Sequence, residues 1–465
     1  MRPSGPPRRS VVGALGAVPL ATVGSPAPDL PAAPHRAPDA RTTLLRNAEL
    51  VLTMDPKVGR GELGTLEHAD VLMRDGAIAA VGRRLPVPHG TRVVDTAGKL
   101  VLPGFVDIHN HLWQSSIRGG CADQDLNGWM TGCNRPTLPR ITPRDMYRFV
   151  RLGALDVLRV GVTTVVDWVH PVPYETGEQY VRALDETGVR FVYAMAQDDD
   201  RLDLLSRVKK DFLDPLPLAS AQVAAHPFLA DVAGLRRRHE IARELGLMLN
   251  CHVLEHRTDR ARDPIRALRA VGAFGPGLLM NHAIHLTEEE IALTADHGVR
   301  VAHCPLSNMR LASGIMPLPA FHRHGVPAGL GHDGGSNDTS DMFGVMKSAV
   351  GLQRALHQDP GVFPTLPAVL RMATLGGAEC VGLADRVGSL TPGKRADVIV
   401  LDPATLNFAP RRNWINQIVL NGQPANVAYV FVDGHPRVAR GRLLDVDTDE
   451  VVRQAEEAAS RLGPL

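Results

Sequence analysis

Eight short apolar runs, separated by longer polar and amphipathic stretches, occupy the middle of this 465-residue chain. Several of the separating stretches repeat apolar residues with the period of a helix, so the pattern predicts alternating strands and helices. Eight such units predict a (β/α)8 barrel of the TIM type, whose parallel strands all end at one face. The predicted strands are 105–111, 163–167, 191–195, 222–226, 247–252, 278–282, 300–303 and 328–333, and the predicted helices are 147–159, 178–187, 235–245 and 287–295.

Histidine or aspartate stands at or beside the end of seven of these runs. The first run ends in His109 and His111, whose side chains leave the same face because side chains alternate along a strand. The later runs end at or beside Asp167, His226, His252, His282, His303 and Asp333. Because the ends of barrel strands face one pocket, and imidazole and carboxylate groups bind metal ions, the pattern predicts a metal centre at that face.

Four of these residues can supply a catalytic metal site: His109, His111, His252 and Asp333. Such a site needs three or four nitrogen and oxygen ligands and one position open for water. A binuclear hydrolase of this architecture usually carries a modified lysine on the fourth strand, but the fourth run here carries His226 and no lysine. We therefore expect one divalent ion, Zn²⁺ in preference to Fe²⁺, although histidine and aspartate suit both.

Strand-like segments also lie at both ends of the chain, from about Leu44 to Leu102 and from Asp397 to Val432. Arg74-Asp75-Gly76 predicts a hairpin between two of them. These segments predict one small β-sandwich domain built from both ends. The predicted boundaries are 41–103 with 385–446 for the small domain, 104–384 for the barrel, and 447–465 for a C-terminal helix.

The first forty residues differ from the rest, with Arg8-Arg9 ahead of an apolar stretch to about Val23 and a segment rich in proline and alanine. This segment resembles a twin-arginine export signal; the alternative is a disordered extension on a cytoplasmic chain. A formal charge of +1 leaves no basic footprint for nucleic acid. No later run approaches the ~18 apolar residues of a membrane span. The five cysteines are odd in number and scattered, which predicts no disulfide framework.

Six motifs, in order, resemble those of the amidohydrolase superfamily: Gly104–His111, His252–Glu255, Asn281–Thr287, His303–Asn308, Gly331–Asn337 and Gly388–Asp397. The resemblance covers about Leu44 to Leu444. It points to the branch of cytosine, guanine and s-triazine deaminases and chlorohydrolases. It therefore implies a metal-dependent hydrolase that acts on carbon–nitrogen bonds other than peptide bonds. The implied substrate is a small molecule, and by family analogy the enzyme is expected to be a homo-oligomer.

Carried over residue by residue, the resemblance implies metal ligation by His109, His111, His252 and Asp333. Glu255 would carry protons, His282 would contact the nucleophile or the substrate, and Asp333 would also accept a proton from water. Some family members use the sixth-strand histidine as a ligand, so both roles stay open for His282. The expected reaction is hydrolytic deamination of a purine, pyrimidine, pterin or triazine-like heterocycle. Hydrolysis of a cyclic amide or chloro-triazine at the same site is the alternative, and a binding protein without turnover is a further one.

Four residues are candidates for substrate contacts: Gln114, Trp113 as an aromatic wall, His226 and Asn308. One stretch departs from the family pattern. The thioadenosine and adenosylhomocysteine deaminases that this branch resembles place a glutamate after a Leu-x-x-Trp stretch to hold a ribose, and Leu126–Arg135 contains no glutamate. The departure favours a free heterocyclic base or a related amidine over a nucleoside.

Overall fold

The structure is a computed structural model that describes residues 42–337 and 339–463. The predicted export segment at 1–40 lies outside these residues. Within them, no helix combines the length and the apolar character needed to span a bilayer.

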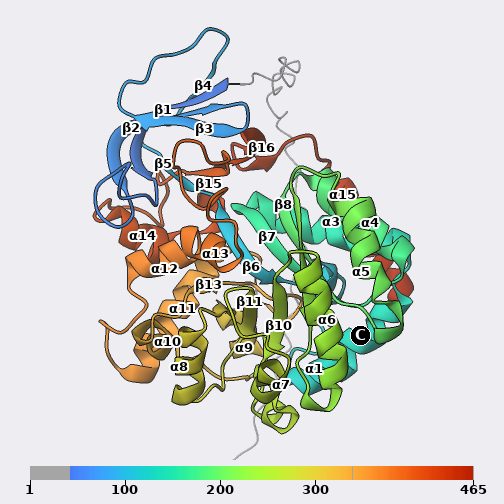
Figure 1. The fold of residues 1–465 in the computed structure, drawn as a ribbon. Coiled ribbons are helices and arrows are strands. Elements are labelled where there is room, and N and C mark those ends of the chain that lie inside the picture. The colour runs from blue at the N-terminus through green and yellow to red at the C-terminus, as the bar shows by residue number, and fades with distance from the viewer. Residues whose placement is uncertain (1–41, 338, 464–465) are drawn as a thin grey trace, which may run out of the picture. The chain divides into compact units, whose positions relative to one another are not determined.

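Eight parallel strands form the predicted barrel in chain order, with helices outside them (Figure 1). They are β6 (Phe105–Asn110), β7 (Val162–Val169), β8 (Arg190–Met195), β9 (Ala219–Ala225), β10 (Leu249–Val253), β11 (Leu278–His282), β12 (Arg300–His303) and β13 (Ala328–Leu330). The first strand meets the chain just after the last one through a bridge between Asn110 and Asp333. The N–H of His111 donates to the carbonyl of Asp333 at 2.8 Å, and the N–H of Asp333 donates to the carbonyl of His109 at 2.8 Å. The barrel prediction is therefore confirmed.

The larger helices follow the strands in turn: α3 (Pro143–Arg159), α4 (Tyr174–Thr187), α5 (Asp203–Val208), α6 (Val232–Glu244), α7 (Pro264–Ala270), α8 (Glu288–Asp296), α9 (Pro305–Arg310), α10 (Leu318–Arg323), α11 (Met342–His357), α12 (Leu366–Met372) and α13 (Leu375–Cys380). Three predicted helices begin three or four residues before the expected start, because their first turns show no apolar period; α3, for example, opens with Pro143. The Thr142 side chain, for example, caps α3 by accepting the N–H of Asp145. The capping box of Thr287 and Glu290 ahead of α8 is present as predicted.

Strands from both ends of the chain join in a second, nine-stranded sheet. They are β1 (Thr42–Leu52), β2 (Thr65–Arg74), β3 (Ala77–Gly82), β4 (Arg92–Asp95), β5 (Leu100–Pro103), β14 (Val398–Leu401), β15 (Val427–Val432), β16 (His435–Ala439) and β17 (Arg442–Leu443). Antiparallel pairing of β14 with β5 connects the two ends. Asp75 and Gly76 turn between β2 and β3 with φ of 49° and 77°, as a type I′ hairpin turn requires. The chain also forms α14 (Trp414–Asn421) and ends with α15 (Thr448–Leu462).

Apolar side chains fill the barrel below the strand ends. One buried cluster includes Val106, Val166, Val192, Leu279 and Ala302 from five of the strands. Helices cover the outer face, so both faces of these strands are buried and the strands are apolar throughout. The barrel interior is thus a packed core, and the site must lie at the strand ends above it.

Arg190, at the start of β8, forms a buried ion pair that links the barrel to the second sheet. Its Nε and Nη2 each donate to the Asp397 carboxylate at 2.9 Å, and Nη2 also donates to Asp433 Oδ1 at 3.0 Å. The side chains of Arg190 and Asp397 are each only 2% exposed. Because Asp397 immediately precedes β14, this pair ties the two sheets together.

We expect Arg190→Met to lower the free energy of unfolding by about 3–5 kcal/mol, because it leaves the buried Asp397 carboxylate unpaired. Urea denaturation followed by circular dichroism measures this change. Arg182→Met is the matched control, since the ion pair of Arg182 with Glu186 on α4 is exposed and contributes about 0–1 kcal/mol. An equal loss in the two variants would contradict the structural role of Arg190.

Candidate active site

Four histidines and one aspartate converge at the strand ends. His109 lies on β6 and His111 directly after it, His252 lies on β10, His282 ends β11, and Asp333 follows β13. The His109 ring centroid lies 4.9 Å from that of His111, 4.7 Å from that of His252 and 5.1 Å from that of His282. The Nε2 atoms of His109 and His111 lie 3.6 and 3.4 Å from Asp333 Oδ1. The structure thus brings the predicted ligand set together.

The chemistry of these side chains fits a divalent ion. Both ring nitrogens of His109 are buried without a hydrogen-bond partner. Nδ1 of His111 is bonded to the Trp168 carbonyl at 2.6 Å, which leaves Nε2 to face Asp333. Two atoms that share a tetrahedral ion at about 2.1 Å lie about 3.4 Å apart, close to the observed spacing. Ligand atoms of His109, His111 and His252 form one group, and those of His109, His282 and Asp333 form another, each within 4.8 Å.

Burial sets the protonation of this cluster. It lowers the pKa of His109 and His252 well below the usual value, and lowers that of His111 to about 3 despite the opposing bond to Trp168. These rings are therefore neutral, which is the form that binds metal ions. Burial raises the pKa of Asp333 to about 7, with an opposing hydrogen bond from Ser307.

Two of the converging residues adopt backbone conformations that are rare outside glycine. His282 has a φ of 67° and Asp333 has a φ of 74°, both in the left-handed region. Such conformations persist where the surrounding structure holds them and are frequent at functional sites. They turn both side chains toward the cluster.

Glu255 lies two residues past the end of β10 and is 6% exposed. Its Oε2 lies 3.6 Å from Nε2 of His282. Burial raises the pKa of Glu255 well above the usual value, and the Asp333 and Asp259 carboxylates raise it further, which favours the protonated form of this carboxyl. Nδ1 of His282 is hydrogen bonded to Nδ2 of Asn308 at 3.0 Å.

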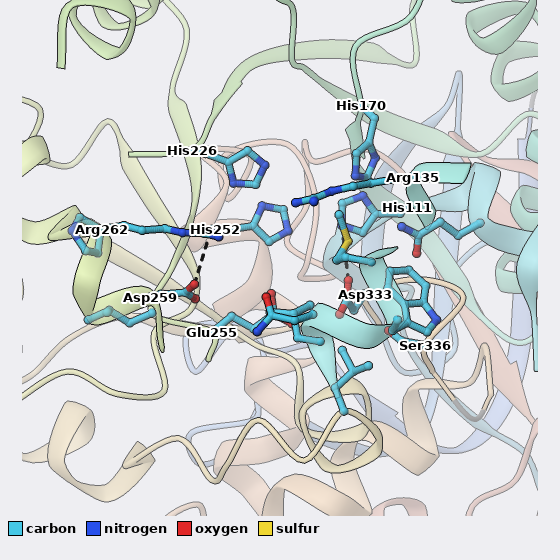
Figure 2. Close-up of a pocket in the computed structure, with 18 of the residues that line it drawn as sticks. His111, Arg135, His170, His226, His252, Glu255, Asp259, Arg262, Asp333 and Ser336 are labelled. Carbon is cyan, nitrogen blue, oxygen red and sulfur yellow. Dashed lines mark ion pairs between the residues drawn. The ribbon is translucent and has the colours of Figure 1, made fainter. Parts of the chain in front are cut away.

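These side chains open into a cavity of about 190 Å³ (Figure 2). Its polar lining includes His111, Gln114, Arg135, His170, His226, His252, Glu255, Asp259, Arg262, Asp333 and Ser336, and its apolar lining includes Leu126, Trp129, Met130, Phe228, Leu254, Pro264 and Leu311. Burial lowers the pKa of His226 to about 4, with nearby arginines acting in the same direction. A small molecule with one or two rings fits such a space.

The profile of the Amidohydrolase family matches residues 100–437. The chain belongs to the amidohydrolase family. A 5-methylthioadenosine/S-adenosylhomocysteine deaminase of Desulforudis audaxviator is 32% identical over 438 residues, which cover 90% of this chain and 98% of that protein. The corresponding protein of Syntrophobacter fumaroxidans is 31% identical over 91% of this chain and 99% of its own length.

Two solved structures extend the comparison. An adenosine deaminase from Xanthomonas campestris with bound zinc has a TM-score of 0.81 and 28% identity, covering 90% of this chain and 98% of its own. An atrazine chlorohydrolase from Arthrobacter aurescens, complexed with zinc, shares the fold with a TM-score of 0.82 and 23% identity, covering 90% of this chain and 100% of its own. The predicted superfamily and the predicted hydrolase of carbon–nitrogen bonds are thus confirmed.

In this amidohydrolase, two of the four predicted substrate contacts line the cavity and two do not. Gln114 and His226 are in the lining. Trp113 is fully buried behind it, because Leu112–Ile117 forms a 3-10 turn that directs the indole inward, where Nε1 donates to Nδ1 of His170 at 3.1 Å. Asn308 is also buried and contacts His282. Trp113 and Asn308 therefore support other side chains in this structure, and substrate contact by the four residues stays a prediction.

The strand-end residues Asp167 and His303 are buried at the periphery of the cluster. Asp167 Oδ1 accepts the N–H of Leu112 at 3.0 Å and so fixes the chain after His111. His303 has both ring nitrogens buried without a hydrogen-bond partner, and it does not line the cavity. Neither residue belongs to the predicted ligand set.

Sequence reasoning missed the pair formed by Asp107 and His332. Oδ2 of Asp107 lies 2.9 Å from Nδ1 of His332, and Oδ1 accepts the N–H of His332 at 3.1 Å. Asn110 Nδ2 donates to the same carboxylate at 2.6 Å. A carboxylate inside the apolar run Phe105–Asn110 was the available signal, because a fully buried charge needs a partner.

The cysteines predicted no disulfide framework, and the structure has one disulfide, between Cys121 and Cys133, which the sequence reasoning did not identify. Both lie in the loop between β6 and α3, which α1 (Leu126–Trp129) and a π-helical turn (Met130–Asn134) fold back on itself. The spacing of the cysteines along the sequence could not show that the loop brings these two side chains together. Leu126, Trp129 and Met130, which lie inside the disulfide-closed ring, line the cavity.

Proposed function

We propose that this amidohydrolase deaminates an N-heterocycle by hydrolysis, with one divalent ion held by His109, His111, His252 and Asp333. The observation that carries the proposal is the buried Glu255 carboxyl, 3.6 Å from His282 and in the same small cavity as the ligand set. A binding protein has no use for a protonated carboxyl at that place. A bound ion, Zn²⁺ in preference to Fe²⁺, would supply the Lewis-acid chemistry that makes water a nucleophile at neutral pH.

The side chains divide the proton transfers among them. Water oxygen adds to the carbon that bears the amino group, and Asp333 accepts the proton that the water loses. Glu255 donates its proton to the adjacent ring nitrogen, then takes the second proton from the added oxygen and passes it to the amino group. Asp333 returns its proton to Glu255, which restores both carboxyl groups to their starting states. The carbon–nitrogen bond then breaks, ammonia leaves, and the water oxygen becomes the carbonyl oxygen of the product.

His282 is suited to a catalytic role in this scheme. With Nδ1 accepting a hydrogen bond from Asn308, the proton of the neutral ring lies on Nε2. Nε2 is buried and has no hydrogen-bond partner. It can therefore donate to the oxygen that becomes negatively charged during attack.

The cavity favours a free base over a nucleoside. The relatives named above are 5-methylthioadenosine/S-adenosylhomocysteine deaminases. In this chain the stretch Leu126–Arg135 contributes Trp129, Met130 and Arg135 to the lining and contains no glutamate. The volume of about 190 Å³ is also below the ~300 Å³ at which pockets for drug-sized ligands begin.

The disulfide bears on the predicted export. Disulfides persist in oxidising compartments and are rare in the cytosol. The Cys121–Cys133 bond is therefore an argument, independent of Arg8-Arg9, for a twin-arginine signal in the N-terminal segment. Export of the folded enzyme would also allow it to take up its ion inside the cell.

A screen of purines, pyrimidines, pterins and triazines on metal-loaded protein tests the proposed function. We expect at least one heterocycle to release ammonia stoichiometrically and to yield the carbonyl product in mass spectrometry. A carboxylate product would indicate cyclic-amide hydrolysis, and chloride release would indicate dechlorination of a triazine. Either result without ammonia would contradict deamination, and binding of heterocycles without any turnover would favour a binding protein.

A further inference from the structure

Two arginines reach the cavity from different loops (Figure 2). Arg262, in the segment after β10, forms an ion pair with Asp259 at 3.6 Å and lies 4.6 Å from the centre of the Phe228 ring. Its charge is therefore compensated within the protein. Arg135 comes from the loop after β6 and extends across the cavity toward His226 (Figure 2). The backbone N–H of Arg135 donates to the Met130 carbonyl, whereas its guanidinium, in an exposed residue, forms no hydrogen bond or ion pair with the part of the chain that the structure describes.

The carboxylates of the lining do not neutralise Arg135. Glu255 lies beside His282 and Asp333 lies beside His109 and His111, so both belong to the proposed metal end of the cavity. Asp259 is paired with Arg262. One guanidinium therefore faces a half-enclosed space without a counter-charge, and such a group attracts an anion.

The chain around Arg135 holds it in place. Arg135 begins α2 (Arg135–Thr137) and lies two residues after Cys133, whose bond to Cys121 closes the loop. Pro136 follows and fixes the backbone further. The disulfide and Pro136 restrain the backbone from which the side chain extends, which lowers part of the ordering entropy that anion binding costs.

We propose that Arg135 is a specificity-determining residue that binds a carboxylate substituent on the heterocyclic substrate. The planar guanidinium forms paired hydrogen bonds with a carboxylate. A cavity of about 190 Å³ suits a one- or two-ring heterocycle that carries this small anion. This inference rests on the proposed deamination, because the reacting ring must lie at the end that holds Glu255.

Matched substrate pairs test the inference: cytosine with 5-carboxycytosine, and pterin with pterin-6-carboxylate. The measured quantity is the ratio of kcat/KM for the carboxylated member to kcat/KM for the neutral member. We expect the wild-type enzyme to prefer the carboxylated member of at least one pair by tenfold or more. Arg135→Gln should lower that ratio by about tenfold or more, and Arg135→Lys should restore part of it.

Arg144→Gln is the matched control because it removes the same positive charge. Arg144 is exposed on α3 and does not line the cavity. It should leave the ratio unchanged. A wild-type enzyme that prefers the neutral member of both pairs would overturn the inference. So would an equal ratio in the wild-type and Arg135→Gln enzymes.

Equilibrium binding separates this inference from the proposed function. Calorimetry with uracil-5-carboxylate and uracil, the products of the first pair, needs no turnover. Tenfold weaker binding of the carboxylate by Arg135→Gln, without ammonia release from any heterocycle, would reject deamination and keep the anion site. Ammonia release with equal carboxylate binding by both proteins would reject the anion site and keep deamination.

Discussion

Glu255→Gln is expected to lower kcat by about 10²–10⁴-fold, the contribution typical of a positioned general acid and base. Glutamine keeps the size and hydrogen-bonding capacity of the side chain but cannot transfer a proton. Because Glu255 is outside the proposed ligand set, metal content should not change. Steady-state ammonia release and elemental analysis of the same samples measure both quantities.

Glu240→Gln provides the matched control, since Glu240 is exposed on α6 and away from the cavity. It should keep both full activity and full metal content. Undiminished turnover by Glu255→Gln would refute the proton-transfer role. Loss of metal from Glu255→Gln would place Glu255 among the ligands instead.

Removal of the ion by chelation is expected to abolish turnover, by at least about 10³-fold, because unassisted water is a poor nucleophile at neutral pH. Titration of the stripped protein with Zn²⁺ should restore activity at one equivalent per chain. Fe²⁺ added under anaerobic conditions gives the direct comparison between the two ions. Activity per equivalent then decides which ion serves the enzyme.

Histidine variants test whether the proposed ligands bind the single equivalent of Zn²⁺. His252→Ala should bind less than one equivalent at the same total Zn²⁺, whereas His357→Ala, an exposed histidine on α11, should bind one. Full activity after exhaustive chelation would rule out a metal-dependent reaction. Two tightly bound equivalents would contradict the mononuclear site expected from the absence of lysine on the fourth predicted strand.

The barrel and the core of the site could be predicted because both depend on patterns local to each strand. A strand buried on both faces must be apolar along its length, and a barrel brings its strand ends to one place. His109, His252 and Asp333 lie far apart in the sequence, yet each strand end alone fixes its position. Strand patterns at the two ends likewise predicted that both ends share one sheet, although not that β5 and β14 would be the strands that pair.

The loops could not be predicted in the same way. The buried position of Trp113 depends on a single turn after His111, and the meeting of Cys121 with Cys133 depends on a helix and a π-helical turn between them. Arg135 is unremarkable in sequence and gains its role only from the cavity that it faces. Side chains on loops are placed by tertiary packing, which no local period encodes.

The closure of the barrel has a consequence for how this enzyme can change. Its first and last strands meet through the backbone of His109, His111 and Asp333, with Asp107 and His332 locked together beside them. An ion bound at these side chains would therefore act as a cross-link between the two edges of the sheet. We therefore expect substitutions that loosen this contact to disturb folding and metal binding together, whereas substitutions in the loops that line the cavity need not disturb either.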